Sequence, residues 1–215
     1  MLRIEHFVCN MIQENTYVVS DDTNECIIID CGVFYESEKK ALSEYILQNH
    51  LHPTRLIATH GHIDHHLGDL YAYKTWGLKP EVHEADEKLM QQLPQQAKAI
   101  CNLNMTQEEF APVGNYFSAS DHISFGNHSL NIIETPGHSP GSVFFYCEEE
   151  KVAFSGDTLF HGSVGRTDFI GGSMFMLIQS LRRVSQLPDD TVILPGHGQK
   201  TTIGQEETSN PYLDR

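Results

Sequence analysis

The chain has 215 residues, which is enough for one domain with a sizeable hydrophobic core. Its 14 basic and 29 acidic residues give a formal net charge of −15, and a field of that sign disfavours nucleic-acid and anionic-membrane partners. The five cysteines are scattered and include no C-x-x-C pair, and the N-terminus has no signal-peptide pattern, so we expect a cytoplasmic protein. No apolar run reaches the roughly 18 residues of a membrane span.

Short runs of β-branched and apolar residues, each followed by a turn, recur along the chain and are typical of buried strands. In chain order they predict strands at 17–20, 26–30, 55–58, 130–135, 143–147, 152–155 and 191–194.

Helical patterns lie between these strands. They cover residues 37–50, 67–77, 83–93 and 173–187. Ser37 is the expected N-cap of the first helix, and we expect the Met and Phe side chains of the 173–187 helix in the core. Residues 94–120 read as an irregular loop with one short helix. Two groups of strands, each followed by helices, predict a single α/β domain over residues 1–215 in which two sheets pack with helices outside.

The stretch "THGHIDHHLG" places four histidines and an aspartate within one loop after a strand. In an extended segment residues i and i+2 point the same way, so His60 and His62 can reach one metal ion. Asp64 and His65 follow where the chain turns into a helix, and they can face a second ion. We expect His66 behind these ligands or on the helix surface, because it points away if Asp64 and His65 point inward.

Two ions need more ligands than this loop supplies, and three later residues each follow a strand and adjoin glycine. They are His138, Asp157 and His197. Imidazole and carboxylate without thiolate suit zinc, and also iron or manganese. Asp30 ends a strand and is a candidate acceptor for a ligand imidazole, or a simple turn former. The remaining histidines lack such a context, and we expect His6, His50, His52, His83, His122 and His128 on the surface; His161 is a candidate for the rim of the site.

The motif H-x-H-x-D-H, followed by a distant His, Asp and His, resembles the metallo-β-lactamase superfamily. The surrounding stretches "ENTYVV", "IIIDCG", "TPGHSPGS", "SGDTLFHGSVGRTD" and "LPGHG" are most similar to its glyoxalase II-like hydrolases. The resemblance covers nearly the whole chain. It implies an αββα sandwich of two mixed sheets with helices on the outer faces.

The same resemblance implies two divalent metal ions, with zinc preferred over iron or manganese. One ion would take His60, His62 and His138, and the other Asp64, His65 and His197, with Asp157 bridging them. Asp64 and Asp157 are the residues it marks as catalytic. The reaction it implies is hydrolysis of a small thioester, such as S-lactoylglutathione, by a hydroxide bridging the metals.

The resemblance is less specific for the residues that contact the substrate than for the metal ligands. Arg166 matches a basic residue that contacts glutathione in glyoxalase II, and the alternative is a salt bridge to Asp168. Asp168 and Gln199 stand where that enzyme has tyrosines, and only 18 residues follow His197 (215 − 197), too few for its C-terminal helical domain.

Three alternatives remain open at this stage. The protein could be a persulfide dioxygenase of the superfamily, which would use one iron. It could also be a member of the superfamily that hydrolyses a different ester or amide. The third alternative is a metal-binding protein without catalysis, which the complete ligand set disfavours. His62 argues against the flavodiiron proteins, which have glutamate there. The sequence leaves the oligomeric state undetermined, and a small molecule is the partner expected.

Overall fold

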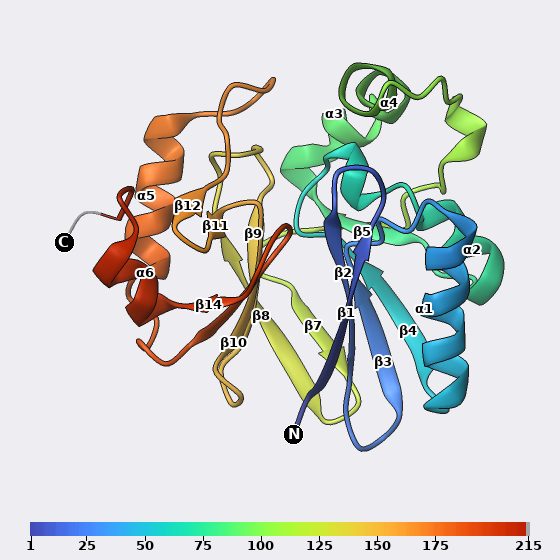
Figure 1. Ribbon diagram of the computed structural model, residues 1–215, viewed down its shortest axis with the longest axis horizontal. Coiled ribbons are helices and arrows are strands. Elements are labelled where there is room, and N and C mark those ends of the chain that lie inside the picture. Colours follow the sequence, from blue (N-terminus) through green and yellow to red (C-terminus); the bar gives the residue numbers. More distant parts are fainter. Residues whose placement is uncertain (214–215) are drawn as a thin grey trace.

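The computed structural model describes residues 1–213, and these form two six-stranded sheets packed face to face with helices on both outer faces (Figure 1). Both sheets mix parallel and antiparallel pairs. The αββα sandwich of two mixed sheets is therefore confirmed.

The first sheet has the order β1-β2-β3-β4-β5-β6, antiparallel through β3 and parallel from β3 to β6. Its strands are β1 (Arg3–Cys9), β2 (Glu14–Ser20), β3 (Glu25–Ile29), β4 (His52–Ile57), β5 (Pro80–His83) and β6 (Asn115–Phe117).

The second sheet has the order β14-β13-β10-β9-β8-β7, and β10–β13 is its parallel pair. Its strands are β7 (His122–Phe125), β8 (His128–Glu134), β9 (Val143–Cys147), β10 (Val152–Gly156), β13 (Val192–Pro195) and β14 (Thr201–Thr202), and a separate hairpin joins β11 (Leu159–Phe160) to β12 (Ser163–Val164).

Helices cover the outer faces of both sheets (Figure 1). Those of the first half are α1 (Glu36–Gln48), α2 (Asp69–Trp76), α3 (Glu87–Met90) and α4 (Leu93–Cys101), with the short 3-10 helices η1 (Ile63–His65), η2 (Glu84–Asp86) and η3 (Gln107–Glu109); those of the second are α5 (Met174–Val184) and α6 (Ile203–Ser209). No helix among the described residues is long and apolar enough to cross a membrane.

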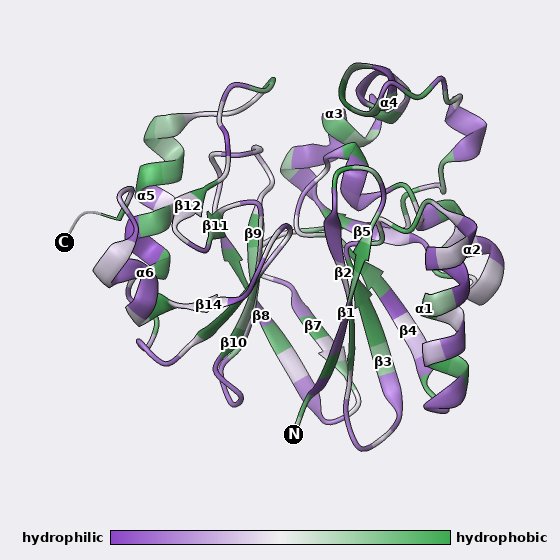
Figure 2. Ribbon diagram, viewed as in Figure 1, coloured by the Kyte–Doolittle hydropathy of each residue, from purple (hydrophilic) through white to green (hydrophobic). Residues whose placement is uncertain are grey.

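The main core lies between the two sheets, where apolar residues of both inner faces interdigitate. Ile27 and Ile57 of the first sheet and Phe145 and Phe154 of the second are all fully buried there. Separate apolar clusters lie under α1 and α2, under α5 and α6, and under α4. Figure 2 shows the result, with hydrophobic strands inside and helices that are hydrophilic along part of their surface.

Several sequence expectations about local structure are wrong. Helix α1 begins at Glu36 with Tyr35 as its N-cap, so Ser37 lies inside the first turn. The expected helix at 83–93 is present only in part: η2 covers Glu84–Asp86, α3 covers Glu87–Met90, and a turn at residues 91–92 separates α3 from α4. Within residues 94–120 the expected short helix is present as the continuation of α4 to Cys101, whereas the strand β6 was not expected.

Other expectations about burial also fail. Leu177, Leu181 and Val184 form the buried face of α5, whereas Met174, Phe175 and Met176 are exposed. His83 and His128 are buried rather than on the surface, because each has a carboxylate partner, Glu134 and Asp21 respectively.

Candidate metal centre

The loop after β4 is held against the end of β3 by a buried carboxylate. Asp30 accepts hydrogen bonds from the backbone N–H of Thr59 at 2.7 Å and from its Oγ1 at 2.8 Å. This contact fixes the point at which the "HGHID" segment leaves the sheet. η1 then turns Asp64 and His65 back toward the sheet edge.

The structure brings His60, His62 and His138 together, as the sequence analysis expected. One ligand atom from each lies within 4.8 Å of the others, and all three side chains are buried. His62 Nδ1 and His138 Nε2 are only 2.8 Å apart. We call these residues the first triad.

A second triad consists of Asp64, His65 and His197, again with donor atoms within 4.8 Å of one another. Asp64 Oδ2 lies 3.1 Å from His197 Nε2 and 3.6 Å from His65 Nε2.

Asp157, at the turn after β10, lies between the two triads. Its Oδ1 is 3.5 Å from His65 Nε2, and its Oδ2 is 3.6 Å from both His138 Nε2 and His197 Nε2. Gly196 makes this approach possible, because a Cβ there would overlap Asp157 Oδ1. One carboxylate thus faces histidines of both triads, and its Oδ2 lies at the same distance from one histidine of each.

The hydrogen bonds of the outer ring nitrogens determine which imidazole lone pairs face the centre. His138 Nδ1 donates to the Arg166 carbonyl at 2.8 Å, and His197 Nδ1 donates to the Gln13 carbonyl at 3.1 Å. His65 Nδ1 lies 3.0 Å from Asp30 Oδ2. With Nδ1 donating in His138 and His197, Nε2 is the nitrogen that faces the centre. Asp30 lies beside the ligand imidazole of His65, but the pair does not meet hydrogen-bond geometry, and His65 Nδ1 has no hydrogen-bond partner among residues 1–213.

His60 follows the same rule. The hydroxyl proton of Thr59 goes to Asp30, so the 3.1 Å contact between Thr59 Oγ1 and His60 Nδ1 requires a proton on the ring nitrogen. Buried His60 Nε2, His65 Nε2 and Asp157 Oδ1 have no hydrogen-bond partner among residues 1–213. Unpartnered buried acceptors that converge in this way fit metal coordination, and the residues present therefore fit two divalent ions.

The electrostatics of the first triad agree with this fit. Burial and the neighbouring imidazole of His138 lower the pKa of His62 to about 3, and burial beside His65 lowers the pKa of His60 well below its ordinary value. These rings are therefore neutral, which is the form that binds metal.

The second triad lies among carboxylates. Burial opposes a charge on His65 and on His197, but nearby carboxylates, Asp64 among them, outweigh it and raise the pKa of both rings. Burial also opposes ionisation of Asp157, but the neighbouring histidines together outweigh it and keep the carboxyl pKa below its usual range. Metal binding at the second triad would release protons from these rings.

His66 lies behind the first triad and has both ring nitrogens engaged. Nε2 donates to the His60 carbonyl at 2.9 Å, and Nδ1 lies 2.7 Å from Asp69 Oδ2. Burial opposes a charge on His66, but Asp69 outweighs it and raises the ring pKa. His66 therefore supports the loop from behind, while His161 is exposed and contacts Gln205 instead of the centre.

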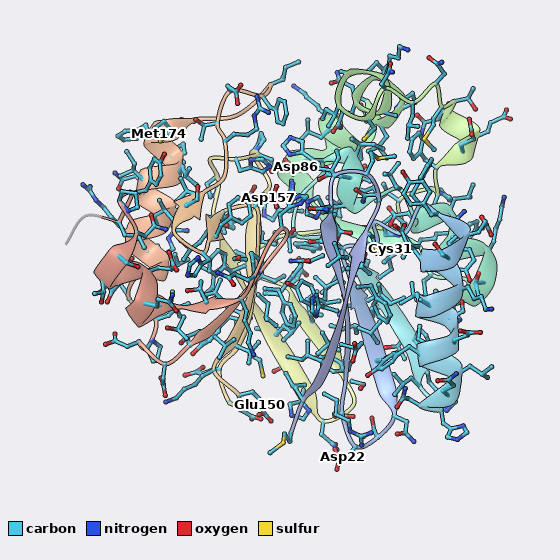
Figure 3. All side chains as sticks on the ribbon, viewed as in Figure 1. Asp22, Cys31, Asp86, Glu150, Asp157 and Met174 are labelled. Carbon is cyan, nitrogen blue, oxygen red and sulfur yellow. The ribbon has the colours of Figure 1, made fainter. Side chains whose placement is uncertain are left out.

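Asp86 is fully buried and joins the two loops that carry the first triad. Its Oδ2 accepts from Gly61 N at 2.8 Å and from Ser139 Oγ at 2.6 Å, and its Oδ1 accepts from Gly141 N at 2.6 Å. Gly61 separates His60 from His62, and Ser139 follows His138. Sequence reasoning missed this residue because nothing near it in the chain is a ligand; Figure 3 shows it near Asp157 in this view.

Glu14 is a second buried acid that sequence reasoning missed. It is fully buried, with Oε1 4.0 Å from His65 Nδ1, and its Oε2 accepts from Thr16 Oγ1 at 2.9 Å. Burial raises the pKa of this carboxyl well above its ordinary value. Together with Asp30 it forms an acidic backing to His65.

Arg166 contributes to the centre through its backbone, since its carbonyl accepts from His138. Its side chain forms two 2.6 Å hydrogen bonds with Asp168 and lies 4.1 Å from the centroid of the Phe169 ring. The structure thus contains the salt bridge that was the alternative to a substrate contact.

The model of the metallo-beta-lactamase superfamily matches residues 10–197, a span that contains both triads and Asp157. The chain belongs to the metallo-beta-lactamase superfamily. It is 36% identical over 219 residues to the hydroxyacylglutathione hydrolase GloC of Haemophilus influenzae, covering 99% of each chain. This likeness confirms the resemblance to the glyoxalase II-like members of the superfamily.

Two solved structures are also similar to this chain. The BLEG-1 B3 metallo-beta-lactamase gives a TM-score of 0.86 at 32% identity, covering 99% of this chain and all of that one. TTHA1623, solved in a di-iron-bound form, gives 0.84 at 33% identity, covering 97% and 100%. The chain is accordingly a metallo-hydrolase of the superfamily, which binds divalent metals, and its histidine-rich triads are the candidate place.

Proposed function

We propose that the protein is a dinuclear metal-dependent hydrolase of small thioesters. One observation carries the proposal: seven donor side chains form two triads that share the carboxylate of Asp157. Two divalent ions bound there would polarise a carbonyl and acidify a water molecule to supply the nucleophile. The ions would be held by His60, His62, His138, Asp64, His65 and His197, with zinc as the preferred metal.

The protein's own groups have separable roles in this scheme. Asp157 would contribute to holding both ions, because its carboxylate lies within 3.6 Å of histidines of both triads. Asp64 would face the second triad only, beside His65 and His197. The Arg166 carbonyl would keep His138 oriented, and Asp30, 3.0 Å from His65 Nδ1, would help to orient His65.

The thioester class rests on the relative named hydroxyacylglutathione hydrolase, at 36% identity over nearly the full length of both chains. We further propose a cytoplasmic location, since all five cysteines are free thiols.

The test is an assay of the zinc-loaded protein on S-lactoylglutathione and on a neutral thioester, with Asp157→Asn and the exposed Asp22→Asn as a matched pair. We expect thiol release that Asp157→Asn lowers by at least about 100-fold and that Asp22→Asn leaves unchanged. Equal rates in all three proteins, or no thiol release, would refute the proposal.

A further inference from the structure

A cavity of about 210 Å³ lies between α4 and the 165–172 loop, next to the first triad. Apolar side chains and three glutamines line it, and the ring of His62 forms part of its wall. Its apolar residues include Leu89, Ala99, Ile100, Phe169 and Ile170. Ile170 is 83% exposed, so an apolar surface beside the centre lacks a cover.

Both walls of the cavity are attached to candidate ligand segments. Gln96 of α4 accepts from Ile63 N at 3.1 Å and donates to the carbonyls of Gly61 at 3.2 Å and Leu89 at 2.8 Å. On the other side, the Phe169 ring packs edge-on against His62, with centroids 5.2 Å apart. The cavity is therefore preformed at a fixed position relative to the first triad.

Charge selects what the cavity can hold. None of the described residues lining the cavity is a lysine or arginine. The net charge of the whole protein is −15, which also disfavours an anionic group. Arg166 stacks on Phe169 from outside the lining, and its guanidinium is already paired with Asp168. A carboxylate entering the cavity would lose water and find no cation there, only neutral amide donors, whereas an alkyl chain would gain apolar contacts.

We propose that this cavity binds an uncharged, apolar acyl group of the substrate, so that the enzyme prefers short-chain fatty acyl thioesters over acidic ones. This inference rests on the proposed thioester hydrolysis. The acyl group is attached directly to the carbonyl that the ions would polarise, and His62 belongs to both the first triad and the cavity wall. The volume suits a chain of a few carbon atoms, because it is smaller than the roughly 300 Å³ of the smallest drug-sized sites.

The first experiment compares acyl groups on one neutral thiol, N-acetylcysteamine, with the zinc-loaded protein. From acetyl to butanoyl we expect kcat/KM to rise roughly fourfold per methylene and then to level off at longer chains. Succinyl has the length of butanoyl but carries a carboxylate, and we expect it to react at least about tenfold more slowly than butanoyl. Acetyl thioesters of longer alkanethiols form the second arm, in which we expect no such rise.

Ala99→Leu places additional side-chain volume in the cavity from α4. We expect it to lower the butanoyl-to-acetyl ratio of kcat/KM by roughly tenfold. Ala41→Leu makes the same substitution at an exposed position on α1, away from the cavity, and should leave the ratio unchanged. Isothermal titration with butanamide, an uncharged analogue of the butanoyl group, gives a readout independent of turnover: Ala99→Leu should weaken binding, and Ala41→Leu should not.

The outcomes separate the two proposals. Thioester hydrolysis without a dependence on acyl length, a succinyl rate equal to that of butanoyl, or a rise that follows the thiol arm would overturn the cavity assignment and leave the hydrolase intact. Absence of hydrolysis would overturn the proposed function, and the butanamide titration would then decide the cavity alone: equal binding by both variants would overturn it.

Discussion

Replacing Asp86 by alanine is expected to loosen the loops of the first triad without touching a ligand. The carboxylate accepts three hydrogen bonds, from Gly61, Ser139 and Gly141, and is fully buried. Its loss leaves two buried backbone N–H groups unpaired at about 1–3 kcal/mol each, and relief from carboxylate desolvation offsets part of that sum. We expect a net loss of about 2–4 kcal/mol in the free energy of unfolding.

The assay is thermal unfolding of the metal-free proteins, followed by zinc competition with a chelator. For a chain of this length the loss corresponds to a Tm lower by roughly 4–16 °C. Asp86→Asn keeps one acceptor oxygen but presents an amide to one N–H donor, so it should fall between wild type and Asp86→Ala. Zinc affinity should decrease in the same order, because Gly61 lies between His60 and His62 and Ser139 follows His138.

Asp22→Ala is the control, since Asp22 is exposed and lies at the opposite end of the molecule (Figure 3). The reasoning would be refuted if metal-free Asp86→Ala unfolded within about 0.5 kcal/mol of wild type, the range of ordinary surface substitutions. Unchanged zinc affinity in the destabilised variant would refute the part that concerns ligand positioning.

Three further predictions concern the centre. Removal of metal by a chelator should lower Tm at micromolar protein, because ions bind the folded state through seven preassembled donors, and a Tm unaffected by chelation would count against the site. Asp157→Ala should lose bound metal and activity. His66→Ala should mainly lose about 3–5 kcal/mol of stability, because it leaves buried Asp69 unpaired. Equal metal loss in the two variants, measured by elemental analysis, would contradict the ligand assignment. Arg166→Ala should change KM for acidic and neutral thioesters by less than about threefold, since the charge is already paired with Asp168, and a selective rise in KM of tenfold or more for the acidic substrate would restore Arg166 as a substrate contact.

The candidate site could be predicted from the sequence where its information is local. His60, His62, Asp64 and His65 occur within one loop, and His138, Asp157 and His197 each follow a recognisable strand and adjoin glycine. Their approach to one another follows from the order of the strands.

The supporting residues could not be found in this way. Asp86 and Gln96 act on loops 25 to 55 positions away, so their partners are defined only once the chain is folded. Glu14 reads as an ordinary strand residue until β2 places it behind His65.

The same limit explains the errors in the fold. The 83–93 stretch has good helical residues, but His83 ends β5, η2 and α3 follow it, and a turn at residues 91–92 precedes α4, so propensity alone did not place the helix boundaries. In α5, apolar residues occur on more than one face, and periodicity alone did not separate buried Leu177 from exposed Phe175. Packing against the second sheet decides that choice.

The most direct test of a two-metal hydrolase is a titration of the metal-free protein with zinc, with thioester hydrolysis recorded at each addition. We expect binding to saturate at about two ions per chain, with most of the activity gained on the second equivalent, because Asp157 faces both triads. Saturation at one ion would contradict the two-metal hydrolase. The strongest contradiction would be one tightly held iron, with oxygen consumption on persulfides and no thioester hydrolysis.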